Sequence, residues 1–106
     1  IGTSKDVASA RKYFHEAALN GHPGGMYMYG KCCLLGLGGD TNYQEAFYFT
    51  EMAASKGDIN AIDGLGYLYE SGLGCKKDIN KAIYYYQMAA NMGCKASIDA
   101  LKRLRK

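Results

Sequence analysis

The fold is decided by residues 61–93, which read AIDGLGYLYESGLGCKKDINKAIYYYQMAANMG. The same pattern returns along the chain at an offset of 36 residues, and no insertion breaks the register. Glycines, alanines and small polar residues occupy the matching positions. The clearest sets are Gly2, Gly38 and Gly74; Asp6, Asn42 and Asp78; Ala10, Ala46 and Ala82; Ala17, Ala53 and Ala89; and Gly21, Gly57 and Gly93. Self-similarity at this period predicts a solenoid of stacked repeats.

Each repeat is expected to hold two helices joined by a turn that contains glycine. The expected ranges are 24–35, 60–71 and 95–105 for the first helices, and 6–20, 42–56 and 78–92 for the second helices. Asn42 with Glu45 resembles a capping box, and Asp6 and Asp78 are good N-cap residues. Gly21 and its repeat equivalents lie where a helix C-cap needs a left-handed residue. The chain is therefore predicted to be all-α.

Aromatic residues and alanines share one face of each second helix. At about 100° per residue, Ala82, Tyr86 and Ala89 lie on the same side. The alanines allow a neighbouring helix to approach closely, and the rings fill the space between helix pairs. The tyrosines expected in the core by register are Tyr13, Tyr69, Tyr85 and Tyr86.

These residues resemble the Sel-1-like repeat family, which is related to the tetratricopeptide helical repeats. Residues 61–93 match the signature A…LG..Y..G.G…D..KA..WY..AA..G, with Tyr85 in the usual Trp position. The resemblance covers essentially the whole chain and implies a right-handed α/α superhelix (solenoid) of 36-residue helix-turn-helix repeats. The unit at 25–57 departs from the pattern at four positions: Gly25, Tyr29, Cys33 and Thr50 replace Ala, Leu, Tyr and Tyr.

The repeat register divides the chain into parts of one repeat domain, 1–106. The expected parts are 1–21, the second half of a truncated repeat; 22–57 and 58–93, two full repeats; and 94–106, a C-terminal capping helix. Ile1-Gly2 falls within the turn between two helices, so we expect the C-terminal end of a longer array. Lys102 and Arg105 stand where Gly66 and Tyr69 stand, and solenoids need such polar caps. At the other edge, exposed apolar residues predict self-association.

Composition excludes several classes of protein. The 106 residues are 48% hydrophobic and 22% charged, which is typical of a folded domain. No apolar run of 18 residues predicts a membrane span. The net charge of +3 is local, because residues 94–106 hold five basic residues and one acidic residue. A near-neutral body with a basic tail makes nucleic-acid binding an unfavoured alternative.

The sequence contains fragments of catalytic, phosphate-binding and metal-binding motifs, but none has the further residues that such a motif requires. Ser9 and Lys12 have the S-x-x-K spacing of penicillin-recognising enzymes, but no K-T-G partner follows. The glycines at 36–39 lack the P-loop spacing and recur as the repeat turn. The four cysteines, Cys32, Cys33, Cys75 and Cys94, show no C-x-x-C spacing for zinc. We therefore predict no catalytic residue, cofactor or metal.

The cysteines also bear on a particular branch of the family. Some bacterial members carry a disulfide in each repeat and bind β-lactams, but the corresponding positions here hold other residues: Ala54, Ala90, Ile62 and Ile98. The disulfide-poor chain is thus an unfavoured relative of those enzymes. Unpaired cysteines favour the cytoplasm, with the secretory lumen or secretion left open.

A strip of polar and aromatic residues on the first helices is the candidate binding surface. Tyr67 lies about 200° from the apolar stripe at Ala61 and Leu65, together with Asp63 and Glu70. The register adds residues from the neighbouring units. The predicted strip is Tyr27, Lys31, Asp63, Tyr67, Glu70, Asp99 and Arg103, with Lys106 beyond it. The alternative is a solvated face with incidental tyrosines.

The resemblance implies a non-enzymatic scaffold or adaptor for protein–protein interaction. In tetratricopeptide-like solenoids the first helices line the concave surface, so this strip would bind a partner protein or peptide there. Exposed tyrosine and arginine are enriched at such interfaces. We expect no small-molecule substrate.

Overall fold

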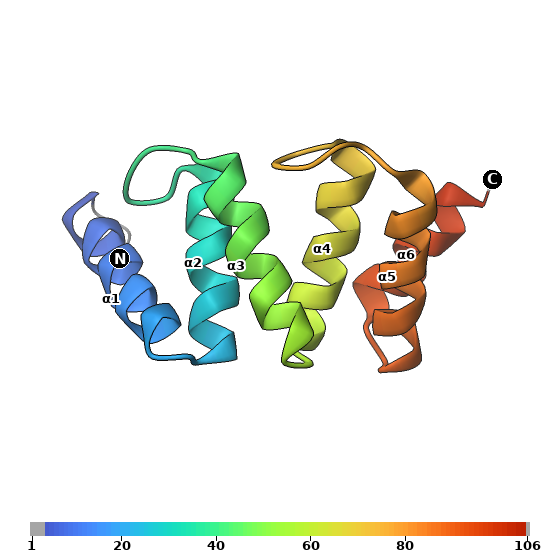
Figure 1. The fold of residues 1–106 in the computed structure, drawn as a ribbon, viewed down its shortest axis with the longest axis horizontal. Coiled ribbons are helices and arrows are strands. Elements are labelled where there is room, and N and C mark those ends of the chain that lie inside the picture. The colour runs from blue at the N-terminus through green and yellow to red at the C-terminus, as the bar shows by residue number, and fades with distance from the viewer. Residues whose placement is uncertain (1–3, 106) are drawn as a thin grey trace.

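The computed structural model describes residues 4–105 and contains helices with no strand in that range (Figure 1). The helices are α1 (Ser4–Leu19), α2 (Pro23–Leu35), α3 (Tyr43–Ser55), α4 (Ile59–Ser71), α5 (Ile79–Asn91) and α6 (Lys95–Leu104). They stand side by side in chain order, and the connections alternate between the two edges of the array, at opposite ends of the helices (Figure 1). This is the predicted helical solenoid. The expected turn at Ile1-Gly2 and the expected position of Lys106 lie outside the described residues.

Side-chain caps begin three of the helices. Asn42 accepts a hydrogen bond from the Glu45 amide at 3.0 Å, and Asp78 does the same for the Lys81 amide. Asp58 caps α4 in the same way through the Ala61 amide. These caps confirm the predictions at Asn42 and Asp78. They also explain why α3 and α5 start one residue later than the expected ranges.

Two expectations about the helix starts are wrong. Asp6 is not an N-cap, because α1 already begins at Ser4 and Asp6 lies in its first turn. The Asn42–Glu45 pair is only half a capping box. The Glu45 carboxylate accepts the Tyr29 hydroxyl at 2.8 Å, and the Asn42 amide donates to the Cys33 carbonyl instead. Contacts with α2 therefore replace the second half of the motif.

Glycine ends the helices as predicted. Gly21, Gly57 and Gly93 have φ between 83° and 94°, and the amide of the residue that follows each reaches back to a helix carbonyl. Gly36 and Gly72 cap α2 and α4 with φ of 68° and 72°. Residues other than glycine rarely adopt this left-handed backbone conformation.

The core follows the repeat register through its alanines. Ala46, Ala53, Ala82 and Ala89 are fully buried and let the helices approach closely. One buried cluster spans α1 to α4 around Met26 and Phe49. A second cluster joins α5 and α6 around Tyr86.

The tyrosines follow the register less well. Tyr86 is buried, as expected. Tyr69 and Tyr85 are only half-buried, and their rings stack on each other at 5.8 Å. The prediction for Tyr13 is wrong: it is 68% exposed, because α1 packs mainly on α2 and its outer face carries no other described helix. Ala10 is exposed for the same reason.

Candidate functional site

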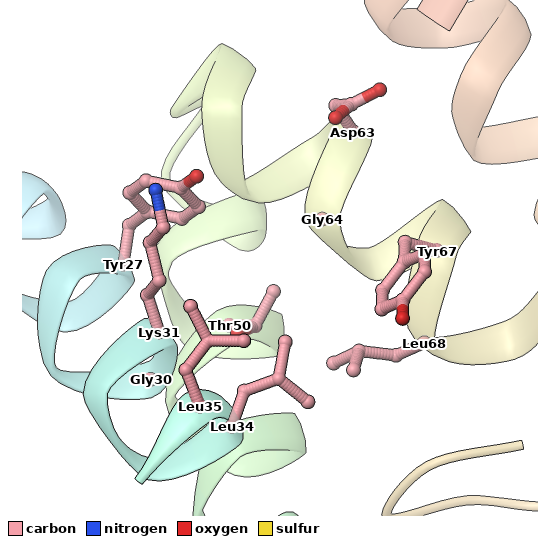
Figure 2. A pocket seen from close by; sticks show the side chains of 10 residues that line it. All are labelled: Tyr27, Gly30, Lys31, Leu34, Leu35, Thr50, Asp63, Gly64, Tyr67 and Leu68. Atoms are coloured by element: carbon pink, nitrogen blue, oxygen red, sulfur yellow. The ribbon is translucent and has the colours of Figure 1, made fainter. Parts of the chain in front are cut away.

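A pocket of about 250 Å³ opens between α2, α3 and α4 (Figure 2). Figure 2 shows Tyr27 and Lys31 on one side and Tyr67 on the other, with Thr50 between them. The pocket therefore lies at the junction of two repeats, on the side of the first helices. The residues that line it are Tyr27, Gly30, Lys31, Leu34, Leu35, Thr50, Asp63, Gly64, Tyr67 and Leu68.

Two tyrosines frame this pocket from opposite helices. Tyr67 on α4 is 46% exposed, so its ring is available to a partner. Tyr27 on α2 is half-buried. Burial raises the pKa of Tyr27, and the nearby carboxylates of Asp63 and Asp58 raise it further. Tyr27 therefore stays neutral at physiological pH and keeps its hydroxyl as a hydrogen-bond donor.

The rim of the pocket carries one charge of each sign. Lys31 is exposed on α2, and no other residue in the described part of the chain forms an ion pair with it. Asp63 on α4 is half-buried, and it accepts a hydrogen bond of 2.6 Å from the Ser97 hydroxyl on α6. That bond turns the Asp63 carboxylate toward α6, and Figure 2 shows it pointing away from Thr50. The mixed rim suits a polar backbone with charged side chains.

Next along the array, a polar network closes the junction between α4 and α6. Arg103 on α6 pairs with Glu70 on α4 through both of its terminal nitrogens. The Tyr86 hydroxyl on α5 donates to the same carboxylate at 2.8 Å. The hydrogen bond from Arg103 lowers the pKa of Glu70, opposed by burial and assisted by Tyr86. Glu70 is therefore a charged residue that links three helices.

The structure brings some of the predicted site residues together and separates others. Tyr27, Lys31, Asp63 and Tyr67 line one pocket. Glu70 and Arg103 are paired with each other at the next junction. Asp99 is exposed on α6 and lines neither the pocket nor the polar network. Lys106 lies outside the described residues.

Sequence reasoning missed the residues that give the pocket its depth. Gly30, Thr50 and Gly64 lie between the tyrosines, and Leu35 and Leu68 complete the apolar wall. One signal was present in the sequence, because Thr50 replaces the Tyr of the repeat pattern. A small residue at a position usually filled by a ring is a direct indication of free space.

A second hollow lies beside α1 and is occupied at its edge by Arg11. The guanidinium donates to the carbonyls of Leu37 and Asp40 at 3.2 and 2.9 Å. It also lies over the Tyr29 ring, 5.7 Å from its centre, and His15 stacks on the same ring at 4.3 Å. These contacts hold the loop between α2 and α3 against α1. They identify Arg11 as a structural residue.

The four cysteines are free thiols in the structure, as expected. Cys32 and Cys33 are buried, and burial raises the pKa of both thiols. Within residues 4–105, no three His, Cys, Asp or Glu side chains gather so that they could bind a metal ion. In the same range, none of the helices combines the length and the apolar character that crossing a membrane requires.

Comparison with known proteins adds a family match along nearly the whole chain. The model of the Sel1 repeat matches residues 1–22, 23–58 and 59–94. No curated protein sequence matches the chain.

Solved structures with the same fold are similar over most of this chain. A Sel1 repeat protein from Oxalobacter formigenes is 30% identical, with a TM-score of 0.84 over 92% of this chain and 28% of that chain. The antigen c5321, a protective antigen of uropathogenic Escherichia coli with an SLR fold, is also 30% identical, with a TM-score of 0.82 over 88% of this chain and 20% of that chain. The chain therefore spans less than a third of the length of either structure.

A third solved structure is similar in fold alone. The cysteine-rich protein B of Helicobacter pylori is 20% identical, with a TM-score of 0.77 over 86% of this chain and 68% of that chain.

Proposed function

Because this chain belongs to the Sel1 repeat family, whose members generally act as protein–protein interaction scaffolds, we propose that it is a non-enzymatic adaptor that binds a partner protein or peptide on its first helices. The observation that carries the proposal is the pocket framed by Tyr27 and Tyr67. The binding strip consists of Tyr27, Lys31, Asp63, Tyr67, Glu70, Asp99 and Arg103.

The chemistry of this strip suits a polypeptide better than a nucleic acid. Exposed tyrosine supplies a large contact area and one hydrogen-bonding group, which is why it is enriched in binding hot spots. Lys31 and Asp63 place opposite charges at the rim. A uniformly anionic backbone would be repelled by Asp63, whereas a peptide can match both charges.

The two arginines at the basic end of α6 form hydrogen bonds with other residues of the chain. Arg103 pairs with Glu70, and Arg105 donates to the Gln87 side chain at 3.0 Å. These intramolecular bonds occupy donor groups of both arginines, which leaves fewer donors for a phosphate backbone. A titration with an RNA or DNA oligomer at two salt concentrations tests this alternative, and specific binding with a steep salt dependence would favour it. Nitrocefin hydrolysis would likewise favour the alternative of a β-lactam-binding relative.

The proposed function is tested by affinity capture with matched variants. The strip variant combines Tyr67→Ala with Lys31→Glu. The control combines Tyr48→Ala with Tyr84→Ala, because these tyrosines are 55% and 60% exposed on the second helices, α3 and α5. A specific partner should be retained by the control and lost by the strip variant. Loss in the control alone would place the binding surface on the second helices and overturn the proposal.

A further inference from the structure

Two residues at the same repeat position give two different junctions. Tyr86 on α5 is 3% exposed, and its ring fills the space between α4 and α6. A Cβ added at Gly66 on α4 would lie only 2.8 Å from that ring. The ring therefore packs directly on the backbone of α4, and the glycine makes this contact sterically allowed.

Thr50 stands exactly one repeat earlier, on α3. Gly30 takes the place of Gly66, and a Cβ added there would lie 2.8 Å from the Thr50 hydroxyl oxygen. A Cβ added at Gly64 on α4 would lie 3.5 Å from the Thr50 methyl group. Thr50 thus faces the repeat-equivalent positions that Tyr86 faces, with Gly30 for Gly66 and Gly64 for Ala100, but it has no ring to fill the space. The missing ring accounts for the pocket of about 250 Å³.

The junction at Thr50 has an apolar wall where the junction at Tyr86 has a polar side chain. Leu34 stands one repeat before Glu70, so the carboxylate that receives the Tyr86 hydroxyl is replaced by a hydrocarbon side chain. Leu35 and Leu68 extend this surface. Burial of an apolar group against such walls is favourable because it removes apolar surface from water.

We propose that this pocket receives a single aromatic side chain from an extended peptide segment of the partner, with an acidic residue beside it that pairs with Lys31. The inference rests on the proposed scaffold function and specifies its ligand. The volume lies just below the range of about 300–1,000 Å³ that is typical of small-molecule sites, and it suits one side chain.

Two further observations support this choice of ligand. The structure itself fills the equivalent space with a ring at Tyr86, and the rings of Tyr27 and Tyr67 flank the entrance, where aromatic groups pack favourably in edge-to-face or offset geometry. Lys31 is exposed at the rim, and in the described part of the chain no carboxylate is paired with it. An acidic residue next to the aromatic anchor would form an ion pair with Lys31.

The test uses a defined peptide and nuclear magnetic resonance of the isotopically labelled chain. The probe is acetyl-Gly-Glu-Phe-Gly-Ser-amide, and the matched control peptide has Ser in place of Phe. We expect saturable shifts at the amides of Gly30, Gly64 and Tyr67 with the Phe peptide. Replacing Phe by Ser should weaken binding at least about tenfold, as expected for a binding anchor. Lys31→Glu should weaken it several-fold.

Two variants fill the pocket from different helices. Thr50→Tyr restores the residue of the family pattern, and Gly64→Leu adds a side chain from α4, where a Cβ meets only ordinary contacts at 3.5 and 3.6 Å. Each should reduce binding of the Phe peptide at least about tenfold with an unchanged helical spectrum. Tyr48→Ala, at an exposed position of α3 outside the pocket, is the control that should still bind.

Several outcomes would overturn the inference. These are no preference for the Phe peptide over the Ser peptide, unchanged binding by a folded pocket-filling variant, or self-association of the chain that both fillers abolish. The experiments can refute the pocket inference and the proposed scaffold function independently of each other. A partner that depends on Tyr67 and Lys31 but tolerates Thr50→Tyr would leave the scaffold function intact and refute the pocket. Peptide binding blocked by Thr50→Tyr, with a partner indifferent to the strip variant, would do the reverse.

Discussion

The Tyr86 hydroxyl on α5 donates a hydrogen bond of 2.8 Å to the Glu70 carboxylate on α4. Arg103 on α6 pairs with the same carboxylate, so one acidic side chain joins three consecutive helices. Glu70 is only 18% exposed, which limits the access of water to these bonds. A network of this kind is expected to stabilise the C-terminal repeat as a unit.

The stability of the protein should depend on the ionisation of Glu70. Arg103 holds the pKa of this carboxyl below its ordinary value of 4.5. A carboxyl with a lowered folded-state pKa stabilises the fold above its unfolded pKa, and this stabilisation is lost as the pH falls through the folded-state pKa. We therefore expect the free energy of unfolding to decrease below about pH 4.5 in urea titrations.

Glu70→Gln provides the matched comparison. The variant should be less stable than the original at pH 7, and the difference should shrink as the pH falls below 4.5. Parallel curves for the original protein and Glu70→Gln over the whole range would show that this carboxylate contributes no linkage.

Gly66 and Gly24 should respond oppositely to the same substitution. Alanine gains up to about 1 kcal/mol of helix propensity over glycine. At Gly66 the new Cβ would lie 2.8 Å from the Tyr86 ring, so Gly66→Ala should destabilise the fold by about 1–3 kcal/mol. At Gly24 no atom lies within 4 Å, so Gly24→Ala should stabilise it by about 0.4–1 kcal/mol. Urea denaturation measures both, and equal effects would contradict the close contact at Gly66.

The repeat register correctly predicted the features that depend on neighbouring residues in the sequence, namely helix caps, helix ends and buried alanines. Asn42 and Asp78 are caps because their side chains reach an amide three residues ahead, and the left-handed glycines end helices for backbone reasons. The buried alanines follow from helical periodicity alone. These features need only short stretches of sequence, which is why the helix ranges were predicted to within about two residues.

The site was less predictable, because it depends on neighbours that differ between repeats. Helical angles placed Tyr27 and Tyr67 on the same side of the array, and both line one pocket. The same angles placed Glu70 on the strip without revealing its bonds to Arg103 and Tyr86, 33 and 16 residues away. The pocket itself required the three-dimensional packing, since a smaller residue at Thr50 leaves a cavity only if the surrounding helices do not collapse.

The cysteines should react at different rates. Burial raises the pKa of Cys32 and Cys33, so little thiolate is present near neutral pH and access is blocked as well. Cys75 and Cys94 are partly exposed, so iodoacetamide should alkylate them before Cys32 and Cys33, as followed by mass spectrometry. Titration under denaturing, non-reducing conditions should count four thiols. A count of zero would mean two disulfides and an oxidising compartment.

Tyr67 and Tyr86 should separate binding from stability. Tyr67 is 46% exposed at the pocket, so Tyr67→Ala should change the free energy of unfolding by no more than about 0.5 kcal/mol. It should weaken partner binding by about 1 kcal/mol or more if the ring is an anchor. Tyr86 is buried between helices, so Tyr86→Ala should cost about 3 kcal/mol or more of stability through the cavity it leaves. Urea denaturation and titration of the captured partner measure the two effects independently. If Tyr67→Ala unfolds the protein while the folded fraction keeps its affinity, Tyr67 belongs to the core and the strip does not bind the partner.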